Sequence, residues 1–352
     1  MVFRNKYTGK INWIPLLGTI AGGLFLIVLL TVILSEVFRG DPVQSTATSS
    51  GSGSMIAQPI TDISYSEASD GSMVIDNYPE YAKDEKKLTE NNIYSKYAVL
   101  LDVKNNQILA DRNCEQKMYP ASMTKIMTTI VAIENLKDLE QEITLTNEMF
   151  EGLYEQDATQ AGFQPGETVR AIDLLYGVML PSGAECCIAL ADTIAGSEAD
   201  FVTLMNEKAA KLGMTGTNFC DTTGLHDANH YSTARDIAVL LKYALKDDTF
   251  REIIESPYHS TPGTNIHPDG ITFYSTMFKN LSDTAVTDGK IMGGKTGYTG
   301  EAGHCLASFA EIDGTEYILV TGGASGTGIP HINDAVTVYN RLGAAAQTLK
   351  AE

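Results

Sequence analysis

The sequence predicts an α+β fold, in which one antiparallel sheet flanked by helices is closed by the first and last segments of the folded part, with an all-helical subdomain inserted between them. Two hairpin signals support this prediction. In "YAVLLDVKNNQILADR" two short apolar runs flank Lys104–Asn106, and in "GHCLASFAEIDGTEYILVTGG" two more flank Asp313 and Gly314. The residues between the hairpins follow a helical period instead.

The helical prediction rests on apolar residues that share one helix face. Three such faces lie between the hairpins: Ile126, Thr129, Ile130 and Ile133; Ile172, Leu175, Tyr176 and Met179; and Phe201, Met205, Ala209 and Leu212. A final helix is predicted from about Ile332 to Lys350. The folded domain is therefore expected to span residues 91–350, with strands near its two ends and helices in its middle.

Composition excludes some classes of partner. The chain has 352 residues, of which 43% are hydrophobic and 20% charged, so it is large enough and apolar enough to bury a core. Its formal net charge of −19 argues against binding nucleic acid and against polybasic attachment to anionic lipid, because both need a basic surface. No nucleic-acid partner is predicted.

A membrane anchor is predicted near the N-terminus. Residues 14–35 contain no charged side chain, and as a helix they would extend about 33 Å, enough to cross a bilayer core. The flanking charges are Arg4, Lys6 and Lys10 before the segment and Glu36, Arg39 and Asp41 after it. The basic side stays in the cytoplasm. We therefore expect a cytoplasmic tail at 1–13, a single span, and everything that follows on the outer face of the cell membrane.

A cleaved signal peptide is the alternative to this anchor. The apolar part of a signal peptide is usually about 7 to 15 residues long, and the nearest small-x-small site here, Ser45–Ala47, is distant. Residues 36–90 are rich in Ser, Thr, Gly and acidic residues and lack apolar periodicity, so a flexible tether is expected there.

No metal or cofactor is predicted. The chain has five cysteines, an odd number, and they lack metal-ligand spacing: Cys114, Cys186, Cys187, Cys220 and Cys305. The adjacent Cys186 and Cys187 are expected to be small core residues. His226 and His230 are four residues apart, but they flank polar residues in a glycine-containing loop, which does not favour a helical metal pair.

The stretch "DGKIMGGKTGYTG" (residues 288–300) satisfies two catalytic patterns. From Gly289 it matches a phosphate-binding loop, and from Lys295 it matches Lys-Thr-Gly of penicillin-type serine acyltransferases. A phosphate loop needs a following helix, whereas strand-like "HCLASFA" follows here, outside the cell. We therefore expect a strand on which Lys295 and Thr296 present a cation and a hydroxyl to a carboxylate, while Gly297 lets a substrate lie close.

Two serines accompany this strand. In "YPASMTKIMTTIVAIENL", Ser122 opens a helix, and Lys125 lies three residues later on the same face, within reach of the hydroxyl. In "GVMLPSGAECCIALAD", Ser182 lies on a turn between helices. Helix capping is the alternative for each serine, and Ser182-x-x-Glu185 fits a capping box. The occurrence of all three motifs in a fixed order, each on a suitable element, favours catalysis.

With these motifs the chain resembles the serine D-Ala-D-Ala carboxypeptidases, the low-molecular-mass penicillin-binding proteins. The resemblance covers about residues 90–347 and includes "YPASMTK", "MLPSG", "GMTGTNFCDTTGLHDANHYSTARDIA" and "GGKTGYTGEAG". It implies a β-lactamase/transpeptidase-like fold with the site between the sheet and the helical subdomain. It also implies removal of the terminal D-Ala from peptidoglycan stem pentapeptides or their lipid-linked precursors, with β-lactams as covalent inhibitors.

The resemblance also implies residue roles. Ser122 is expected to be the nucleophile that forms an acyl-enzyme, Lys125 the general base with a pKa lowered by burial and by the cation of Lys295, and Ser182 the proton donor to the leaving amine. Lys295 and Thr296 are expected to bind the terminal carboxylate. The N–H groups of Ser122 and Tyr298 are expected to form the oxyanion hole, so that the substrate-binding set is Lys295, Thr296, Gly297 and Tyr298.

One departure from the family pattern leaves alternatives open. The second motif is usually Ser-x-Asn, and Ala184 takes the place of the Asn, so lowered or retuned activity is expected. One alternative is a non-catalytic sensor of stem peptides or penicillins. Another is a β-lactamase, although "TNFCDTTGLHDAN" lacks the Glu that often speeds deacylation. An accessory role in glycopeptide resistance is a further possibility within the main interpretation.

Overall fold

The computed structural model describes residues 3–4, 11–12, 65–67, 73–75 and 78–351. It divides into one unit over Met1–Met55 and another over Ile56–Glu352. In the first unit, the described residues form a hairpin of β1 (Phe3–Arg4) and β2 (Ile11–Asn12). The predicted anchor at 14–35 and most of the predicted tether lie outside the described residues. Within the described part, no helix combines the length and the apolar character needed to span a bilayer.

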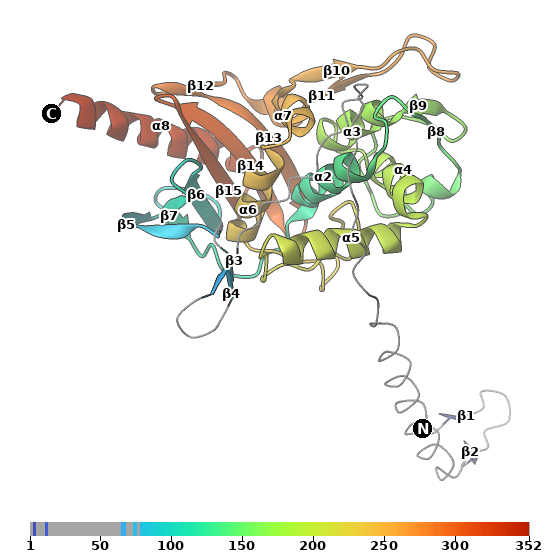
Figure 1. Ribbon diagram of the computed structural model, residues 1–352, viewed down its shortest axis with the longest axis horizontal. Helices are drawn as coiled ribbons and strands as arrows, with labels where there is room; N and C mark the ends of the chain where they lie inside the picture. The colour runs from blue at the N-terminus through green and yellow to red at the C-terminus, as the bar shows by residue number, and fades with distance from the viewer. Residues whose placement is uncertain (1–2, 5–10, 13–64, 68–72, 76–77, 352) are drawn as a thin grey trace, which may run out of the picture. The chain divides into compact units, whose positions relative to one another are not determined.

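The second unit is built on a seven-stranded sheet with strand order β12-β13-β14-β15-β6-β7-β5 (Figure 1). The strands are β5 (Glu80–Lys87), β6 (Tyr97–Asp102), β7 (Gln107–Arg112), β12 (Ala285–Val286), β13 (Gly289–Thr299), β14 (Gly303–Ile312) and β15 (Thr315–Ala324). β6 from the first predicted hairpin pairs antiparallel with β15 from the second, with Val99 opposite Val320. Early and late segments of the chain therefore share one sheet, as predicted.

The two predicted hairpins are confirmed. β6 and β7 are joined by the turn that contains Lys104–Asn106, and Asn106 has φ 55°. β14 and β15 are joined by Asp313 and Gly314, with φ 51° and 68°. Two consecutive residues with positive φ form the tight turn whose twist matches that of the strands, and Asp-Gly adopts it readily.

One part of the sheet was not predicted. β5 runs parallel to β7 at the sheet edge, inside the segment expected to be a tether, so the prediction that folded structure begins at residue 91 is wrong. An edge strand is held by its backbone hydrogen bonds, and most side chains of β5 are exposed. Apolar periodicity, on which the prediction relied, is therefore absent.

The predicted helices are present. The helices are α2 (Lys125–Asn135), α3 (Ala171–Met179), α4 (Ala184–Ala195), α5 (Glu198–Lys211), α6 (Ala234–Ala244), α7 (Asp248–Glu255) and α8 (Pro330–Ala351), with 3₁₀ turns η1 (Ala121–Thr124), η2 (Glu148–Phe150) and η3 (Phe278–Asn280). The inserted subdomain also has two-stranded pairs, β8 (Glu142–Thr144) with β9 (Thr168–Arg170) and β10 (Tyr258–Ser260) with β11 (Thr272–Tyr274). The all-helical prediction is wrong there, because three-residue strands are too short to show alternation. A further pair, β3 (Tyr65–Glu67) with β4 (Met73–Ile75), precedes β5.

Separate cores cover the two faces of the sheet. On one face α8 packs through Ile332, Val338 and Tyr339 against strand residues that include Leu306 and Leu319. The Tyr339 hydroxyl donates to the Ser308 carbonyl at 3.1 Å. On the other face the helices between β7 and β13 form the larger core, in which Cys186 and Cys187 are fully buried as predicted. The three motifs lie where this helical part meets β13.

Candidate active site

Ser122 and Lys125 are placed together by a helix start. Ser122 lies on η1, and Lys125 is the first residue of α2. The Lys125 Nζ donates to the Ser122 Oγ at 3.2 Å and to the Thr223 carbonyl at 2.7 Å, and the Lys125 side chain is only 3% exposed. The N-cap residues of η1 and α2 are Pro120 and Thr124, so Ser122 occupies the N-cap position of neither helix. The predicted contact between Ser122 and Lys125 is therefore present, whereas the alternative, in which Ser122 caps the helix, is not observed.

Ser182 does not form the capping box. α4 begins at Ala184 with Gly183 as its N-cap, so Glu185 lies one position too early in the helix for the box. Ser182 has a φ of 76°, which directs its side chain elsewhere, and its Oγ accepts from the Lys295 Nζ at 3.0 Å. The Glu185 Oε1 instead accepts from the backbone N–H of Ala161 at 2.7 Å, which ties the preceding loop to α4.

Lys295 lies on the opposite wall of the site, on β13. Its Nζ donates to the Ser182 Oγ and, at 3.0 Å, to the Thr296 carbonyl. Complete burial, and next the nearby ammonium of Lys125, lower the pKa of Lys295 well below its usual value. The Thr296 hydroxyl is 2.6 Å from the hydroxyl of Thr276, a residue that motif spacing did not reveal.

Gly297 explains how the two walls meet. A Cβ at this position would lie 2.9 Å from the Ser122 backbone N, 3.1 Å from the Ala121 Cβ and 3.2 Å from the Pro120 carbonyl oxygen. The missing side chain thus lets β13 pack against η1. In the structure the close approach at Gly297 is to the turn that carries Ser122, whereas the sequence interpretation assigned it to substrate.

A groove of about 670 Å³ runs between these walls. Five of the seven predicted site residues line it, namely Ser122, Ser182, Thr296, Gly297 and Tyr298, while Lys125 and Lys295 are buried behind its surface. Among the described strands, β12 pairs only with Gly289 and Lys290 of β13. From Lys295 to Thr299 the outer edge of β13 therefore has no partner among the described strands, and residues 296–299 line the groove.

The segment "DTTGLHDANH" packs against η1 and holds Lys125, which motif spacing alone did not predict. Thr223 supplies the carbonyl that accepts from Lys125. Gly224 has φ 83°, and a Cβ there would lie 1.9 Å from the Ala121 carbonyl oxygen, so only glycine fits against η1. His230 is buried, and its Nε2 is 2.8 Å from the Thr124 hydroxyl. The resemblance had included this segment without giving it a role.

His226 and His230 have different partners. The His226 ring packs edge-on against Tyr119 with centroids 4.7 Å apart, whereas His230 contacts Thr124 and Asp221. Within the described residues, no group of three or more His, Cys, Asp or Glu side chains is placed to hold a metal ion.

Comparisons with known proteins agree with this geometry. Residues 84–326 match the family model described as D-alanyl-D-alanine carboxypeptidase, peptidase S11. The chain is 32% identical to DacF of Bacillus subtilis over 246 residues, covering 69% of this chain and 61% of the relative. It is 40% identical to DacC of Escherichia coli over 160 residues, covering 42% of this chain and 39% of the relative.

The fold of this chain is also similar to that of a solved DD-peptidase. The crystal structure of the Streptomyces K15 DD-transpeptidase superposes with a TM-score of 0.65 and 26% identity, covering 74% of this chain and 99% of that one. The phosphate-loop interpretation of residues 288–300 fails, because these residues lead into and form β13, and strand β14 follows. Although the matches span only part of the curated relatives, the family model covers more than half of this chain, which therefore belongs to the D-alanyl-D-alanine carboxypeptidase family, peptidase S11.

Proposed function

We propose that this protein is a serine D-Ala-D-Ala carboxypeptidase, which removes the terminal D-Ala of a peptidoglycan stem pentapeptide through an acyl-enzyme on Ser122. The contact between the Lys125 Nζ and the Ser122 Oγ carries this proposal. It lies at the groove, opposite a second lysine–serine pair on the other wall. Family membership supports the same reaction.

In the acylation step, the Ser122 Oγ attacks the carbonyl carbon of the penultimate D-Ala, and Lys125 accepts the hydroxyl proton. The C–N bond to the terminal D-Ala then breaks. Ser182 delivers a proton to the departing amine, and Lys295 lies within hydrogen-bond distance to replace it. The products are an ester on Ser122 and free D-alanine.

Deacylation reverses these roles with water as the nucleophile. Before this step the proton that Lys125 took from Ser122 restores the proton that the Ser182–Lys295 pair gave to the amine, so Lys125 is neutral again. Lys125 then takes a proton from the water that attacks the ester and returns it to the Ser122 Oγ as the tetrahedral intermediate collapses. A β-lactam would acylate the same hydroxyl. It would inhibit because its ring-opened acyl group retains the leaving amine.

The substrate is proposed to bind along the open edge of β13. Lys295 and the Thr296 hydroxyl hold its terminal carboxylate, and the backbone N–H groups of Ser122 and Tyr298 stabilise the oxyanion. The unpaired edge next to these residues supports this placement, because an extended peptide can add to such an edge as another strand.

The test is release of D-alanine from a diacetyl-lysyl-D-Ala-D-Ala peptide by the full chain, with Ser122→Ala as the control. We expect release that depends on Ser122. Labelling of Ser122 by a fluorescent penicillin without any release of D-alanine would support the second candidate, a non-catalytic sensor. That candidate is kept because Ala184 occupies the position where the family usually has Asn.

We further propose that residues 14–35 anchor the protein in the cell membrane with residues 36–350 outside, where stem peptides and lipid-linked precursors occur. The uncharged run and the basic residues before it support this proposal. Protease added to intact spheroplasts should digest the catalytic part, and protection would contradict this topology. A role in glycopeptide resistance is a narrower proposal, tested by whether deletion of the gene increases sensitivity to vancomycin.

A further inference from the structure

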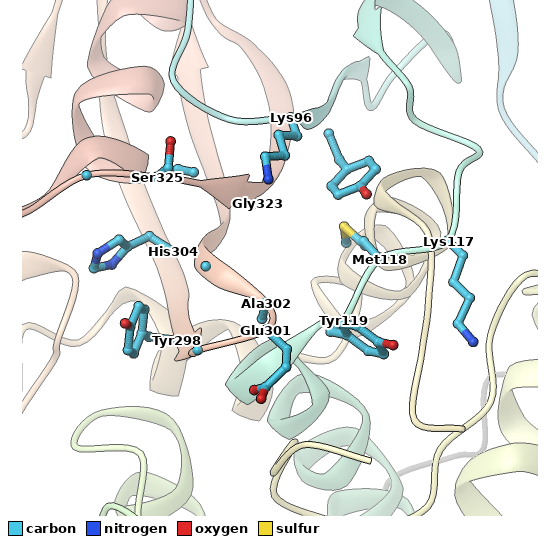
Figure 2. A pocket seen from close by; sticks show the side chains of 15 residues that line it. Lys96, Lys117, Met118, Tyr119, Tyr298, Glu301, Ala302, His304, Gly323 and Ser325 are labelled. Atoms are coloured by element: carbon cyan, nitrogen blue, oxygen red, sulfur yellow. The ribbon is translucent and has the colours of Figure 1, made fainter. Parts of the chain in front are cut away.

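A second cavity of about 440 Å³ adjoins the catalytic groove (Figure 2). It lies where the β13–β14 turn, the end of β15 and the segment before η1 meet. The two spaces share four residues, Tyr298, Gly300, Glu301 and His304. A ligand that follows β13 beyond Tyr298 therefore passes from the groove into this cavity.

The cavity carries charges of both signs in a fixed order. Glu301 borders the groove and the cavity alike, and its carboxylate lies 4.0 Å from the His226 Nδ1. Lys96 projects from the other side of the cavity, opposite Glu301 in Figure 2. No hydrogen bond or ion pair of the Lys96 side chain occurs among the described residues.

Lys117 also lines the cavity, but its ammonium is already engaged. Its Nζ donates to the Ala228 carbonyl at 3.0 Å and lies 4.0 Å from the centre of the Tyr231 ring. Lys96 is thus the available cation of this cavity within the described part of the chain. In a protein with a net charge of −19, an unpaired lysine facing a cavity suits an anionic ligand group.

The direction of the bound substrate links the cavity to the reaction. If Lys295 and Thr296 hold the terminal carboxylate and Tyr298 faces the scissile carbonyl, the substrate runs antiparallel to β13. Each earlier residue of an extended peptide then lies about 3.3 Å further along, toward Gly300 and Glu301. The part of the stem peptide that precedes the two D-alanines therefore reaches Glu301 first and Lys96 afterwards.

Along a stem peptide, read from its C-terminal D-alanines, the charged groups follow the complementary order, with a cationic group first and an anionic group next. The residue before the two D-alanines is a diamino acid with an amine on its side chain. The residue before that is a glutamate joined through its side-chain carboxyl, so its main-chain carboxylate is free. We infer that the cavity is a subsite for this upstream half, in which Glu301 binds the ammonium and Lys96 binds the glutamyl carboxylate. This inference rests on the proposed function.

Binding to a Ser122→Ala version of the full chain tests the subsite without turnover. Four ligands are compared: a stem pentapeptide, the same peptide with its glutamyl carboxylate amidated, the same peptide with its side-chain amine acetylated, and diacetyl-lysyl-D-Ala-D-Ala. Lys96→Gln and Glu301→Gln are the test variants. Lys104→Gln and Glu311→Gln are matched controls, because both residues are exposed and lie outside the cavity.

We expect Lys96→Gln to weaken binding of the free-carboxylate peptide about fivefold, the size expected of one partly exposed ion pair, and to leave binding of the amidated peptide unchanged. Glu301→Gln should weaken binding only of peptides with a free amine. Equal effects on all four ligands, an effect as large in the control variants, or no measurable binding of the stem peptide would overturn the subsite.

The same series separates this inference from the proposed function. With Ser122 intact, absence of D-alanine release from every peptide overturns the carboxypeptidase proposal, whereas charge-selective binding in the Ser122→Ala chain still supports the subsite. Conversely, release of D-alanine that is equally fast for the free-carboxylate and amidated peptides, with equal affinities in the binding series, supports the carboxypeptidase and overturns the subsite.

Discussion

The two walls of the catalytic groove each hold one buried lysine, and the fold places the two lysines differently. On the η1–α2 wall, Lys125 lies three residues after Ser122, and its ammonium donates to that hydroxyl and to the Thr223 carbonyl. On the β13 wall, Lys295 lies 113 residues after Ser182 and donates to that hydroxyl and to the Thr296 carbonyl. Among the described residues, neither ammonium contacts a carboxylate.

The two lysine–serine contacts therefore depend on different parts of the fold. The contact between Ser122 and Lys125 on the η1–α2 wall is local, so one turn of helix forms it. The contact on the β13 wall forms only when the sheet and the helical subdomain pack together, and its lysine is fully buried with a lowered pKa. A buried cation without a counter-charge lowers stability, and such costs are characteristic of functional sites. In our proposal the substrate carboxylate supplies the missing charge.

The largest effect is expected from Lys295→Met. It should lower kcat/KM for D-alanine release on the order of 10³-fold, because the terminal carboxylate loses its cation. It should also stabilise the fold, since replacing a buried ion by an apolar side chain can contribute about 1 to 4 kcal/mol. Because the pKa of Lys295 is lowered on folding, this gain should be largest at low pH, decrease as the pH rises above the lowered pKa, and disappear near the ordinary lysine value of 10.5.

Calorimetry between pH 7 and 10.5, together with the D-alanine assay, measures both effects. Lys290→Met is the control, because Lys290 is exposed on the same strand. Lys290→Met should change neither the thermal midpoint nor the rate of D-alanine release. A lower thermal midpoint for Lys295→Met at pH 7 would show that the β13 wall is stabilised by its lysine, and the contrast between the two walls would fail.

Gly297→Ala should push the walls apart. The added Cβ meets backbone atoms of Ser122 and Pro120, which cannot rotate away. A displacement of the nucleophile by even about 1 Å can cost about 100-fold in turnover. Lys290→Ala is the control, because Lys290 is exposed on the same strand and does not line the groove. Unchanged turnover of Gly297→Ala would mean that η1 and β13 need not be in close contact for catalysis.

The same contrast explains how much could be predicted from the sequence. The contact between Ser122 and Lys125 follows from helical spacing, and the hairpin turns follow from Asn106 and Asp313-Gly314. Nothing in the spacing brings Lys295 to Ser182, and only the order of the motifs and the family resemblance suggested a common site. Such contacts depend on tertiary packing, which one-dimensional patterns do not describe.

The rejected alternative for Ser182 and the missed strand have a related cause. The capping box considered as the alternative for Ser182 and Glu185 satisfied a local rule, but the structure uses Glu185 to hold the N–H groups of Ala161 and Gly162. β5 was missed because its partner, β7, holds it through the backbone. A local pattern predicts what a segment can do alone, and in both places a distant segment decides what it does.

Ala184→Asn tests whether an amide between the walls improves the site. Ala184 is the buried first residue of α4, two positions after Ser182. By analogy with other positioned polar groups, an Asn should raise turnover about tenfold. Ala184→Leu is the matched control, because it adds similar bulk without an amide and should not raise turnover. Equal or lower turnover of Ala184→Asn would show that this chain does not lack the amide.

Thr276→Val should have the smallest effect and acts on the β13 wall alone. The Thr276 hydroxyl is 2.6 Å from the Thr296 hydroxyl, and the Thr276 backbone N–H donates to the Leu180 carbonyl just before the Ser182 turn. Losing the hydroxyl should raise KM about threefold with little change in kcat, because in our proposal Thr296 binds the substrate carboxylate but does not react. Thr276→Ser should restore the KM of the parent. A fall in kcat with unchanged KM would instead place Thr276 among the groups that act on the transition state. The β13 wall would then contribute to the chemical step as well as to substrate binding.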